Sequence, residues 1–129
     1  MKKRILVVDD EKNLAKALKS RFIHWGYEAD AALTGEEALD KVETFKPHLI
    51  ILDIRMPKIG GIEVLETTKK RNPNIRVLIL TASQSKDTYT ICMKKQADGF
   101  MLKPFELHAI KEKVEEIFKS IDVGNSYDQ

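Results

Sequence analysis

The sequence has a single cysteine, no large excess of charge of one sign and no long apolar run. Because Cys92 is alone among 129 residues, an internal disulfide framework is excluded. Lysine and arginine number 22 against 20 aspartates and glutamates, with the signs mixed along the chain, so composition indicates neither a nucleic-acid nor a membrane partner. No apolar run is long enough to cross a bilayer or to act as a secretory signal. These absences predict a reducing, cytoplasmic location.

The length limits the organisation of the chain. A sequence of 129 residues with ordinary apolar content makes one domain, which is large enough to fold alone. We expect this domain to span residues 1–120. Residues 121–129 are predicted to form a C-terminal tail or the start of a linker.

Strand-like and helix-like segments alternate along the chain. The apolar runs ILVV, LIIL and VLIL lack the period-two alternation of a sheet with one wet face, so they indicate strands covered on both faces. The segment EADAAL is less apolar and suits an edge strand. We expect strands near residues 4–8, 27–32, 48–52, 75–80 and 99–102.

Helical patterns separate these strands. Apolar residues recur at helical spacing after the first, second and last strands, and each stripe can cover one face of a sheet. Thr34 followed by Glu37 forms a capping box, which predicts a helix start. The alternation implies right-handed crossovers and an α/β fold of the (βα)5 type. We expect a doubly wound parallel five-stranded sheet in the flavodoxin-like order 2-1-3-4-5.

Polar residues of different kinds stand at the ends of four apolar strands. They are Asp9 and Asp10 after the first strand, Asp53 after the third, Thr81 after the fourth and Lys103 after the fifth. In open α/β sheets ligands bind just outside the carboxyl ends of the strands. We therefore expect these five side chains to share one pocket.

Each of these residues also has a purely structural interpretation. The first acid pair and Thr81 could be helix N-caps. Asp53 could order the turn before Pro57, and Lys103 could be a solvated charge. Structural turns, however, do not require three acids and a lysine at one sheet edge, because neighbouring carboxylates repel unless a cation lies among them. Their joint occurrence favours a functional site.

Magnesium is the cation that such a cluster indicates. Mg²⁺ prefers oxygen ligands and is usually held by one or two carboxylates plus a phosphate oxygen. A closed zinc site is not indicated, because no histidine or cysteine lies at ligand spacing. Successive strand residues point opposite ways, so we expect Asp10 to contact Mg²⁺ directly and Asp9 to act through water.

Asp53 is the candidate nucleophile. A carboxylate can attack a phosphoryl group and form an aspartyl phosphate. Asp53 is single, ends the central apolar strand, and lies between the acid pair on one side and Thr81 and Lys103 on the other. Phosphoryl transfer needs in-line positioning and neutralised oxygen charge more than it needs a base. We expect Mg²⁺ and Lys103 to supply that charge.

Five motifs carry a resemblance to a known family: VVDDE, LDIRMP, GGIEVL, LTAS and GFMLKPF, in this order and at this spacing. Together they resemble the receiver domains of bacterial two-component response regulators, and chemotaxis receivers in particular. The resemblance extends from Met1 to about Ser120. It implies that Asp53 is the phosphoacceptor, and that Asp10 and Asp53 hold Mg²⁺ with Asp9 acting through water. The backbone carbonyl of Arg55 would complete the protein ligands.

The same resemblance implies how such a domain works. The phosphoryl group comes from a phosphohistidine on a sensor kinase or phosphotransfer protein, or from a small donor, and the domain catalyses only its own phosphorylation and dephosphorylation. Thr81 and Phe100 would carry the switch: Thr81 moves to the phosphoryl group, and Phe100 turns inward. Arg55 and Ser83 would tune the lifetime of the acyl phosphate. The Lys103–Pro104 peptide bond would be cis.

Other positions carry weaker expectations. Gln96 stands where glycine often closes the fourth helix, which predicts a strained or differently shaped C-cap there. Gly60 replaces the acid or amide usual before the third helix. The run at residues 69–71, together with Arg76, predicts a solvated basic face rather than a nucleic-acid contact. Trp25 is predicted to cover the core away from the site.

The output surface is expected on the fourth helix, the last strand and the last helix. Tyr89, Lys94, His108 and Lys111 are its candidate contacts for an output protein that the sequence does not identify. Two alternatives remain open. One is a receiver from a longer regulator with a missing output domain; the other is a magnesium-dependent aspartyl phosphohydrolase. The latter needs an acid two residues after the nucleophile, where this chain has Arg55.

Overall fold

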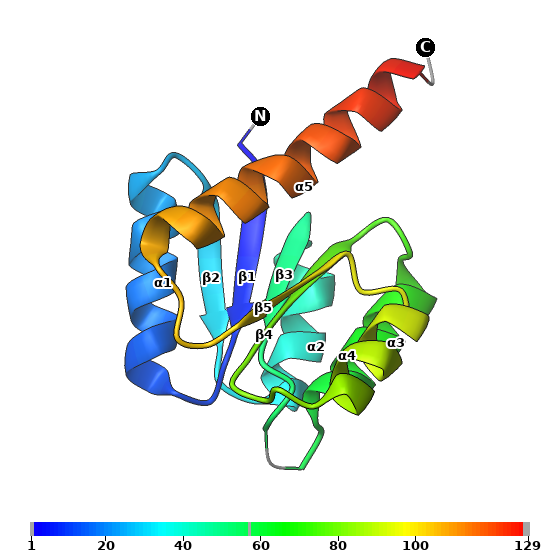
Figure 1. Cartoon of the computed structure of the whole chain (residues 1–129). Coiled ribbons are helices and arrows are strands. Elements are labelled where there is room, and N and C mark those ends of the chain that lie inside the picture. The colour runs from blue at the N-terminus through cyan, green and yellow to red at the C-terminus, as the bar shows by residue number, and fades with distance from the viewer. Residues whose placement is uncertain (1, 57, 128–129) are drawn as a thin grey trace.

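The computed structural model describes residues 2–56 and 58–127, in which strands and helices alternate (Figure 1). Pro57 and the last two residues of the expected tail lie outside the described residues. The strands are β1 (Arg4–Val8), β2 (Glu28–Ala32), β3 (Leu49–Leu52), β4 (Arg76–Thr81) and β5 (Gly99–Leu102). The helices are α1 (Lys12–His24), α2 (Gly35–Thr44), α3 (Gly61–Arg71), α4 (Lys86–Lys94) and α5 (Leu107–Tyr127).

The five strands form one parallel sheet in the order β2-β1-β3-β4-β5. This confirms the predicted doubly wound (βα)5 fold and its strand order. Each observed strand lies within about one residue of its expected range. The less apolar β2 lies at an edge, as its sequence predicted.

Each face of the sheet carries its own hydrophobic core. Alternate residues of a strand point to opposite faces, so Leu6 and Val8 pack with residues of α2, α3 and α4. Ile5 and Val7 pack instead with residues of α1 and α5. The continuous apolar runs in the sequence are thus explained, because the central strands are buried on both sides (Figure 1).

The capping box that begins α2 is confirmed. The Thr34 Oγ1 accepts a hydrogen bond from the backbone N–H of Glu37 at 3.1 Å. The Glu37 carboxylate accepts in turn from the backbone N–H of Leu33 at 2.9 Å. Two N–H groups at the start of the helix are therefore satisfied by side chains.

The fourth helix forms, and its end has the hydrogen bonds of a Schellman motif. The Gln96 N–H donates to the Met93 carbonyl at 3.1 Å, and the Ala97 N–H donates to the Cys92 carbonyl at 3.0 Å. Gln96 takes a positive φ of 73°, in the region that glycine adopts without steric cost. The C-cap therefore has the ordinary shape, and the expected strain lies in the backbone conformation of Gln96, which has a Cβ where glycine has none.

The basic run at the end of α3 is only partly solvated, so that prediction was wrong for Lys69. Its side chain is 8% exposed, and its ammonium donates at 2.8 Å both to the Asp98 carboxylate and to the Ile75 carbonyl. The guanidinium of Arg76 also lies 3.8 Å from Asp98. Asp98 directly precedes β5, and Arg76 is the first residue of β4. These contacts therefore tie α3 to the start of β4, whereas Thr81 lies at its end.

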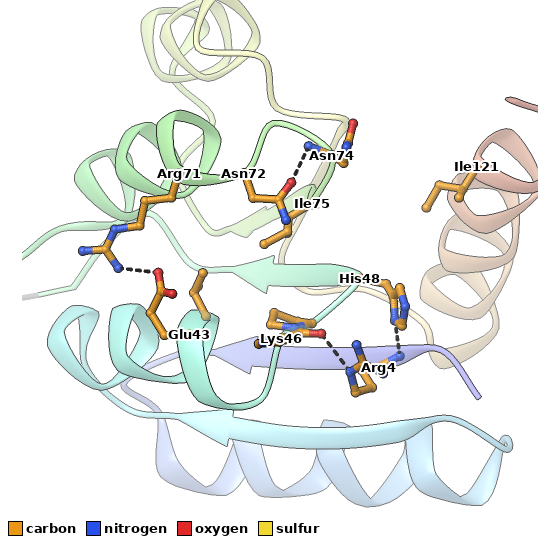
Figure 2. Close-up of a pocket in the computed structure, with 11 residues that line it drawn as sticks. Arg4, Glu43, Lys46, His48, Arg71, Asn72, Asn74, Ile75 and Ile121 are labelled. Atoms are coloured by element: carbon orange, nitrogen blue, oxygen red, sulfur yellow. Dashed lines mark hydrogen bonds and ion pairs between the residues drawn. The ribbon is translucent and has the colours of Figure 1, made fainter. Parts of the chain in front are cut away.

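The amino-terminal edge of the sheet holds a hollow of about 510 Å³, shown in Figure 2. Arg4, His48 and Arg71 are among the residues that line it. The His48 Nδ1 accepts a hydrogen bond from the backbone N–H of Arg4 at 2.9 Å, and the Arg4 guanidinium donates to the Lys46 carbonyl at 2.8 Å. These contacts join β1 to the segment before β3 at this edge.

Helix α5 continues past the expected end of the domain. It runs from Leu107 to Tyr127 and extends beyond the sheet in Figure 1. Ile121 still packs against the core that contains Ile5 and Val7. The described part of the expected tail is therefore helical, and the domain boundary at residue 120 stays a prediction. Among the described residues, no helix is both long and apolar enough to cross a membrane.

Candidate functional site

Backbone hydrogen bonds beyond the strand ends align the predicted site residues. The Asp53 N–H donates to the Val8 carbonyl at 2.9 Å, which places Asp53 beside the end of β1. The Lys103 N–H donates to the Thr81 carbonyl at 2.9 Å, which places Lys103 beside the end of β4. The parallel ladder thus brings residues far apart in sequence to the carboxyl edge of the sheet.

Three carboxylates converge at this edge. Asp9, Asp10 and Asp53 each offer an oxygen, and these oxygens lie within 4.8 Å of one another. Asp9 and Asp53 are buried, at 2% and 6% exposed, whereas Asp10 is exposed. Such crowding of negative charge is costly without a nearby cation.

Lys103 supplies a positive charge to this cluster. Its Nζ lies 2.7 Å from Asp9 Oδ2, 3.5 Å from Asp53 Oδ2 and 3.8 Å from Glu11 Oε1. The Lys103 side chain is only 13% exposed, so its interpretation as a solvated charge was wrong. The Lys103–Pro104 peptide bond is cis, as the resemblance implied.

The acids at the ends of β1 and β3 also order the following turns. Asp9 Oδ1 accepts from the Glu11 N–H at 2.9 Å, and Asp53 Oδ1 accepts from the Arg55 N–H at 3.1 Å. Neither Asp9 nor Asp10 is the N-cap of α1, because Glu11 occupies that position. Asp10 makes no hydrogen bond or ion pair with the described residues, so both of its oxygens remain open to a ligand.

Burial and neighbouring charge shift the pKa values of Asp53 and Lys103. Burial raises the pKa of Asp53, and the charge of Asp9 adds to this; the Arg55 N–H and the Lys103 ammonium oppose it only in part. For Lys103, burial works to lower the pKa, but the hydrogen bond to Asp9 and the charges of Asp9, Asp53 and Glu11 outweigh it and raise the pKa. Lys103 therefore stays an ammonium.

Thr81 lies fully buried at the end of β4, where it lines the edge of the site. Its Oγ1 accepts a hydrogen bond from the Ser83 N–H at 3.2 Å. Thr81 is not the N-cap of α4, because Ser85 holds that position and accepts from the N–H groups of Asp87 and Thr88. The Ser83 hydroxyl is directed to α4, where it lies 3.4 Å from the Thr88 hydroxyl.

Phe100 lies on β5 and packs partly buried against the core that contains Leu6 and Val8. Its ring meets the ring of Tyr89 edge to face, with 5.2 Å between the centroids. Sequence patterns did not reveal this pair, nor the pair of hydroxyls at Ser83 and Thr88. The β-branched and aromatic character of the segment DTYTIC was the signal available for both.

Comparison with known proteins identifies the class to which this architecture and site belong. Residues 5–115 match the model of the response regulator receiver domain, and the chain belongs to this family. Receiver domains are signalling modules of two-component systems rather than enzymes in the ordinary sense. In response regulators they interact with sensor kinases and with output domains.

Particular relatives support this assignment. The chain is 37% identical to the alkaline phosphatase synthesis transcriptional regulatory protein PhoP of Bacillus subtilis, over 96% of this chain and 52% of the relative. It is 32% identical to the chemotaxis protein CheY of Thermotoga maritima, over 92% of this chain and the whole of CheY. The chain thus spans about half the length of several curated relatives it matches and the full length of another.

Solved structures show the same architecture. A CheY-like receiver domain from Methanospirillum hungatei superposes with a TM-score of 0.93 at 29% identity, covering 96% of this chain and 99% of that one. The beryllium-fluoride-activated receiver domain of DrrB matches with a TM-score of 0.84 at 27% identity, over 92% of this chain and 99% of that one.

Proposed function

We propose that this chain accepts a phosphoryl group on Asp53 and uses it to switch a surface read by an output partner. The observation that carries the proposal is the placement of the Asp53 carboxylate. It is buried between two further aspartates and the Lys103 ammonium, which lies 3.5 Å from Asp53 Oδ2. In a receiver domain, this arrangement suits a carboxylate nucleophile with a cation beside it.

The proposed transfer uses one carboxylate oxygen of Asp53. That oxygen attacks the phosphorus of a phosphohistidine on a sensor kinase or phosphotransfer protein, the new O–P bond forms, and the P–N bond breaks. The electron pair of the broken bond returns to the imidazole of the donor. Lys103 faces the developing negative charge on the phosphoryl oxygens and stabilises it. A small donor such as acetyl phosphate can replace the histidine donor.

The acid cluster fits magnesium as its cofactor. Three carboxylate oxygens within 4.8 Å of one another form the oxygen-rich donor set that Mg²⁺ prefers. We infer that Asp10 and Asp53 contact the ion and that Asp9 acts through water. The Asp10 oxygens are free, and Lys103 holds Asp9 Oδ2 closely, at 2.7 Å, but lies 3.5 Å from Asp53 Oδ2. The Arg55 carbonyl, beside Asp53, would complete the set. When bound, Mg²⁺ neutralises charge on the phosphoryl oxygens.

The switch follows from the change of charge at Asp53. The Thr81 hydroxyl turns from the Ser83 N–H to a phosphoryl oxygen, and Phe100 moves inward into the space that becomes available. A charge-assisted hydrogen bond made in one state only shifts a two-state equilibrium about ten- to a hundredfold. Arg55 and Ser83 lie beside Asp53 and Thr81, and we propose that they tune how long the acyl phosphate survives.

The output surface proposed here comprises α4, β5 and α5. Tyr89 is 49% exposed, and Lys94, His108 and Lys111 are also exposed on these helices. The output partner is either a separate protein or a further domain, since relatives that span only this domain and relatives of twice its length both occur. We place the chain in the cytoplasm, where its kinase would act. Arg55 occupies the acid position of a phosphohydrolase, so that alternative is not favoured.

The experiment that tests the proposal is intact mass measurement after incubation with acetyl phosphate, with and without Mg²⁺. We expect one added phosphoryl group that depends on Mg²⁺ and is absent from Asp53→Ala. Asp40→Ala is the matched control, because Asp40 lies on α2 outside the acid cluster. An adduct that survives Asp53→Ala, or no adduct at all, would overturn the assignment of Asp53.

A further inference from the structure

Helix α4 is attached to the switch residues by an aromatic pair. The Tyr89 ring meets the Phe100 ring at 5.2 Å between centroids and an interplanar angle of 79°. This edge-to-face geometry is the one that aromatic pairs prefer. Tyr89 is half exposed, whereas Phe100 packs against the core. The Tyr89 ring therefore covers the outer side of Phe100.

The preceding residue of the same helix makes a second attachment. The Thr88 hydroxyl lies 3.4 Å from the hydroxyl of Ser83, and the Ser83 N–H donates to Thr81 Oγ1. Ser83 is 6% exposed, so its hydroxyl lies inside the protein, where hydroxyls need partners, and the partly buried Thr88 supplies one. Two consecutive residues of α4 thus contact Phe100 and, through Ser83, Thr81.

An open groove lies beside the aromatic pair. It measures about 700 Å³ and is lined by Tyr89, Phe100 and Leu102, with the loop before α4 on its other side. Both rings line the groove, so each keeps an accessible part beside their mutual contact. Among the described residues, Tyr89 makes the one ring contact of Phe100, so it is the aromatic contact that an inward turn of Phe100 would break.

We propose that Tyr89 is a positioning residue that holds Phe100 outward in the unphosphorylated protein, and that Tyr89 and Thr88 together make α4 a latch against switching. The inference rests on the proposed function, because it requires the inward movement of Phe100. A contact present in one of two states favours that state by its own free energy. For an aromatic pair this corresponds to a shift of roughly two- to tenfold.

The test is the apparent affinity of the full chain for beryllium fluoride in excess Mg²⁺, followed by ¹⁹F NMR. This probe mimics a phosphoryl group without a covalent transfer. We expect Tyr89→Leu to bind beryllium fluoride about two- to tenfold more tightly than the wild type, because the latch is removed. Tyr89→Phe keeps the ring pair and is the matched control, expected within twofold of the wild type.

The second attachment is tested in the same assay. Thr88→Val removes the hydroxyl but keeps the shape, so we expect tighter binding, whereas Thr88→Ser keeps the hydroxyl and should resemble the wild type. A variant that is merely destabilised would bind the probe more weakly, so tighter binding cannot arise from a folding defect.

The outcomes separate the latch from the proposed function. If the wild type binds beryllium fluoride and Tyr89→Leu binds equally or more weakly, the latch is overturned and the proposed function stands. If the wild type fails to bind the probe in Mg²⁺, the proposed function is overturned and the latch with it. If Tyr89→Phe binds as tightly as Tyr89→Leu, the ring is not the element that holds Phe100.

Discussion

Among single residues, Gly61 is notable because its backbone lies close to the backbone at Asp53 and Ile54. A Cβ atom at Gly61 would stand 2.5 Å from both the Asp53 carbonyl oxygen and the Ile54 Cα. Because both neighbours are backbone atoms, the β3–α3 turn would have to shift. We expect Gly61→Ala to lower the free energy of unfolding by about 1–3 kcal/mol, as overpacked sites do. Urea unfolding measures this loss.

The adjacent glycine provides a matched control for Gly61. A Cβ atom at Gly60 would meet only the Met56 carbonyl oxygen, at 3.9 Å, which is ordinary contact. Gly60 is also the N-cap of α3, where serine is well tolerated. Gly60→Ser should therefore keep the stability of the wild type. Equal losses for Gly60→Ser and Gly61→Ala would contradict the steric argument.

His48 should make stability depend on pH at the amino-terminal edge of the sheet. Burial lowers the pKa of His48 from its ordinary value of 6.5, and the charges of Arg4 and Lys3 add to this. The hydrogen bond that its Nδ1 accepts from the Arg4 N–H also requires the neutral ring (Figure 2). The unfolded chain thus binds a proton at His48 more readily than the folded chain does.

The free energy of unfolding therefore decreases as the pH falls from 6.5 to the lowered pKa of folded His48. Above pH 6.5 the contribution of His48 is fully present. In His48→Asn an amide oxygen can replace the Nδ1 acceptor, but no proton binds. We expect the wild type to lose stability relative to His48→Asn between pH 7.5 and pH 5, in urea unfolding at each pH. Parallel stability curves for the two proteins would refute this assignment.

The convergence of the polar strand ends at one sheet edge could be predicted from the sequence, but several of their contacts could not. Asp9, Asp53, Thr81 and Lys103 follow apolar strands whose parallel pairing fixes where their backbones meet. The choice of Asp9 over Asp53 as the nearer partner of Lys103 depends on side-chain geometry at the tenth-of-a-nanometre scale. A periodic pattern contains no information of that kind, so the hydrogen bond required the structure.

At the scale of elements, the end of α4 requires a backbone conformation that its residue, Gln96, does not favour. Gln96 takes a positive φ of 73°, which costs a residue with a Cβ roughly 1 kcal/mol relative to glycine. We expect Gln96→Gly to raise the free energy of unfolding by about 1 kcal/mol, less any gain in the entropy of the unfolded chain. Thermal unfolding, converted to a free-energy difference, measures the gain.

An alanine at the same position isolates the cause. Gln96→Ala removes the polar side chain but keeps the Cβ, so it should give no stabilisation. A gain in Gln96→Ala equal to that in Gln96→Gly would show that the side chain of Gln96, and not its backbone conformation, is unfavourable. Hydrogen exchange at Cys92 and Met93 would locate the effect within the helix.

The elements themselves were predictable to the extent that their signals are local. The capping box at Thr34 and Glu37 and the central apolar strands were located correctly because each depends on a few neighbouring residues. Lys69 was mistaken for a solvated charge because its partner, Asp98, lies 29 positions away in the sequence. Contacts of this range leave no trace in the periodicity of either segment.

At the scale of the whole molecule, the indole of Trp25 lies far from the site. It follows the last residue of α1 and packs edge to face on Phe22 at 5.6 Å, as its predicted role on the core requires. Helix α1 begins next to the acids and has 13 residues. At 1.5 Å per residue this separates Trp25 from the site by about 20 Å.

Trp25 should therefore report unfolding but not switching. We expect its emission to change strongly in denaturing urea and by less than about a tenth when beryllium fluoride and Mg²⁺ are added, because its ring packs on Phe22 at the other end of α1 from the acids. Trp25→Phe, which is dark at the excitation wavelength of tryptophan, gives the background. A large emission change on adding the probe would show that the switch reaches the α1–α5 face.

The direction of α5 bears on how the protein can be handled and extended. The helix starts near Lys103, passes over the sheet, and leaves it beside Arg4 and His48, at the edge opposite the acids (Figure 1). A fluorescent protein or an immobilisation tag joined behind Tyr127 would thus be carried on a helical spacer away from the edge that holds the acids. A surface-coupled sensor made in this way would leave the carboxyl edge of the sheet, where Asp53 lies, turned toward the bulk solution and an incoming donor.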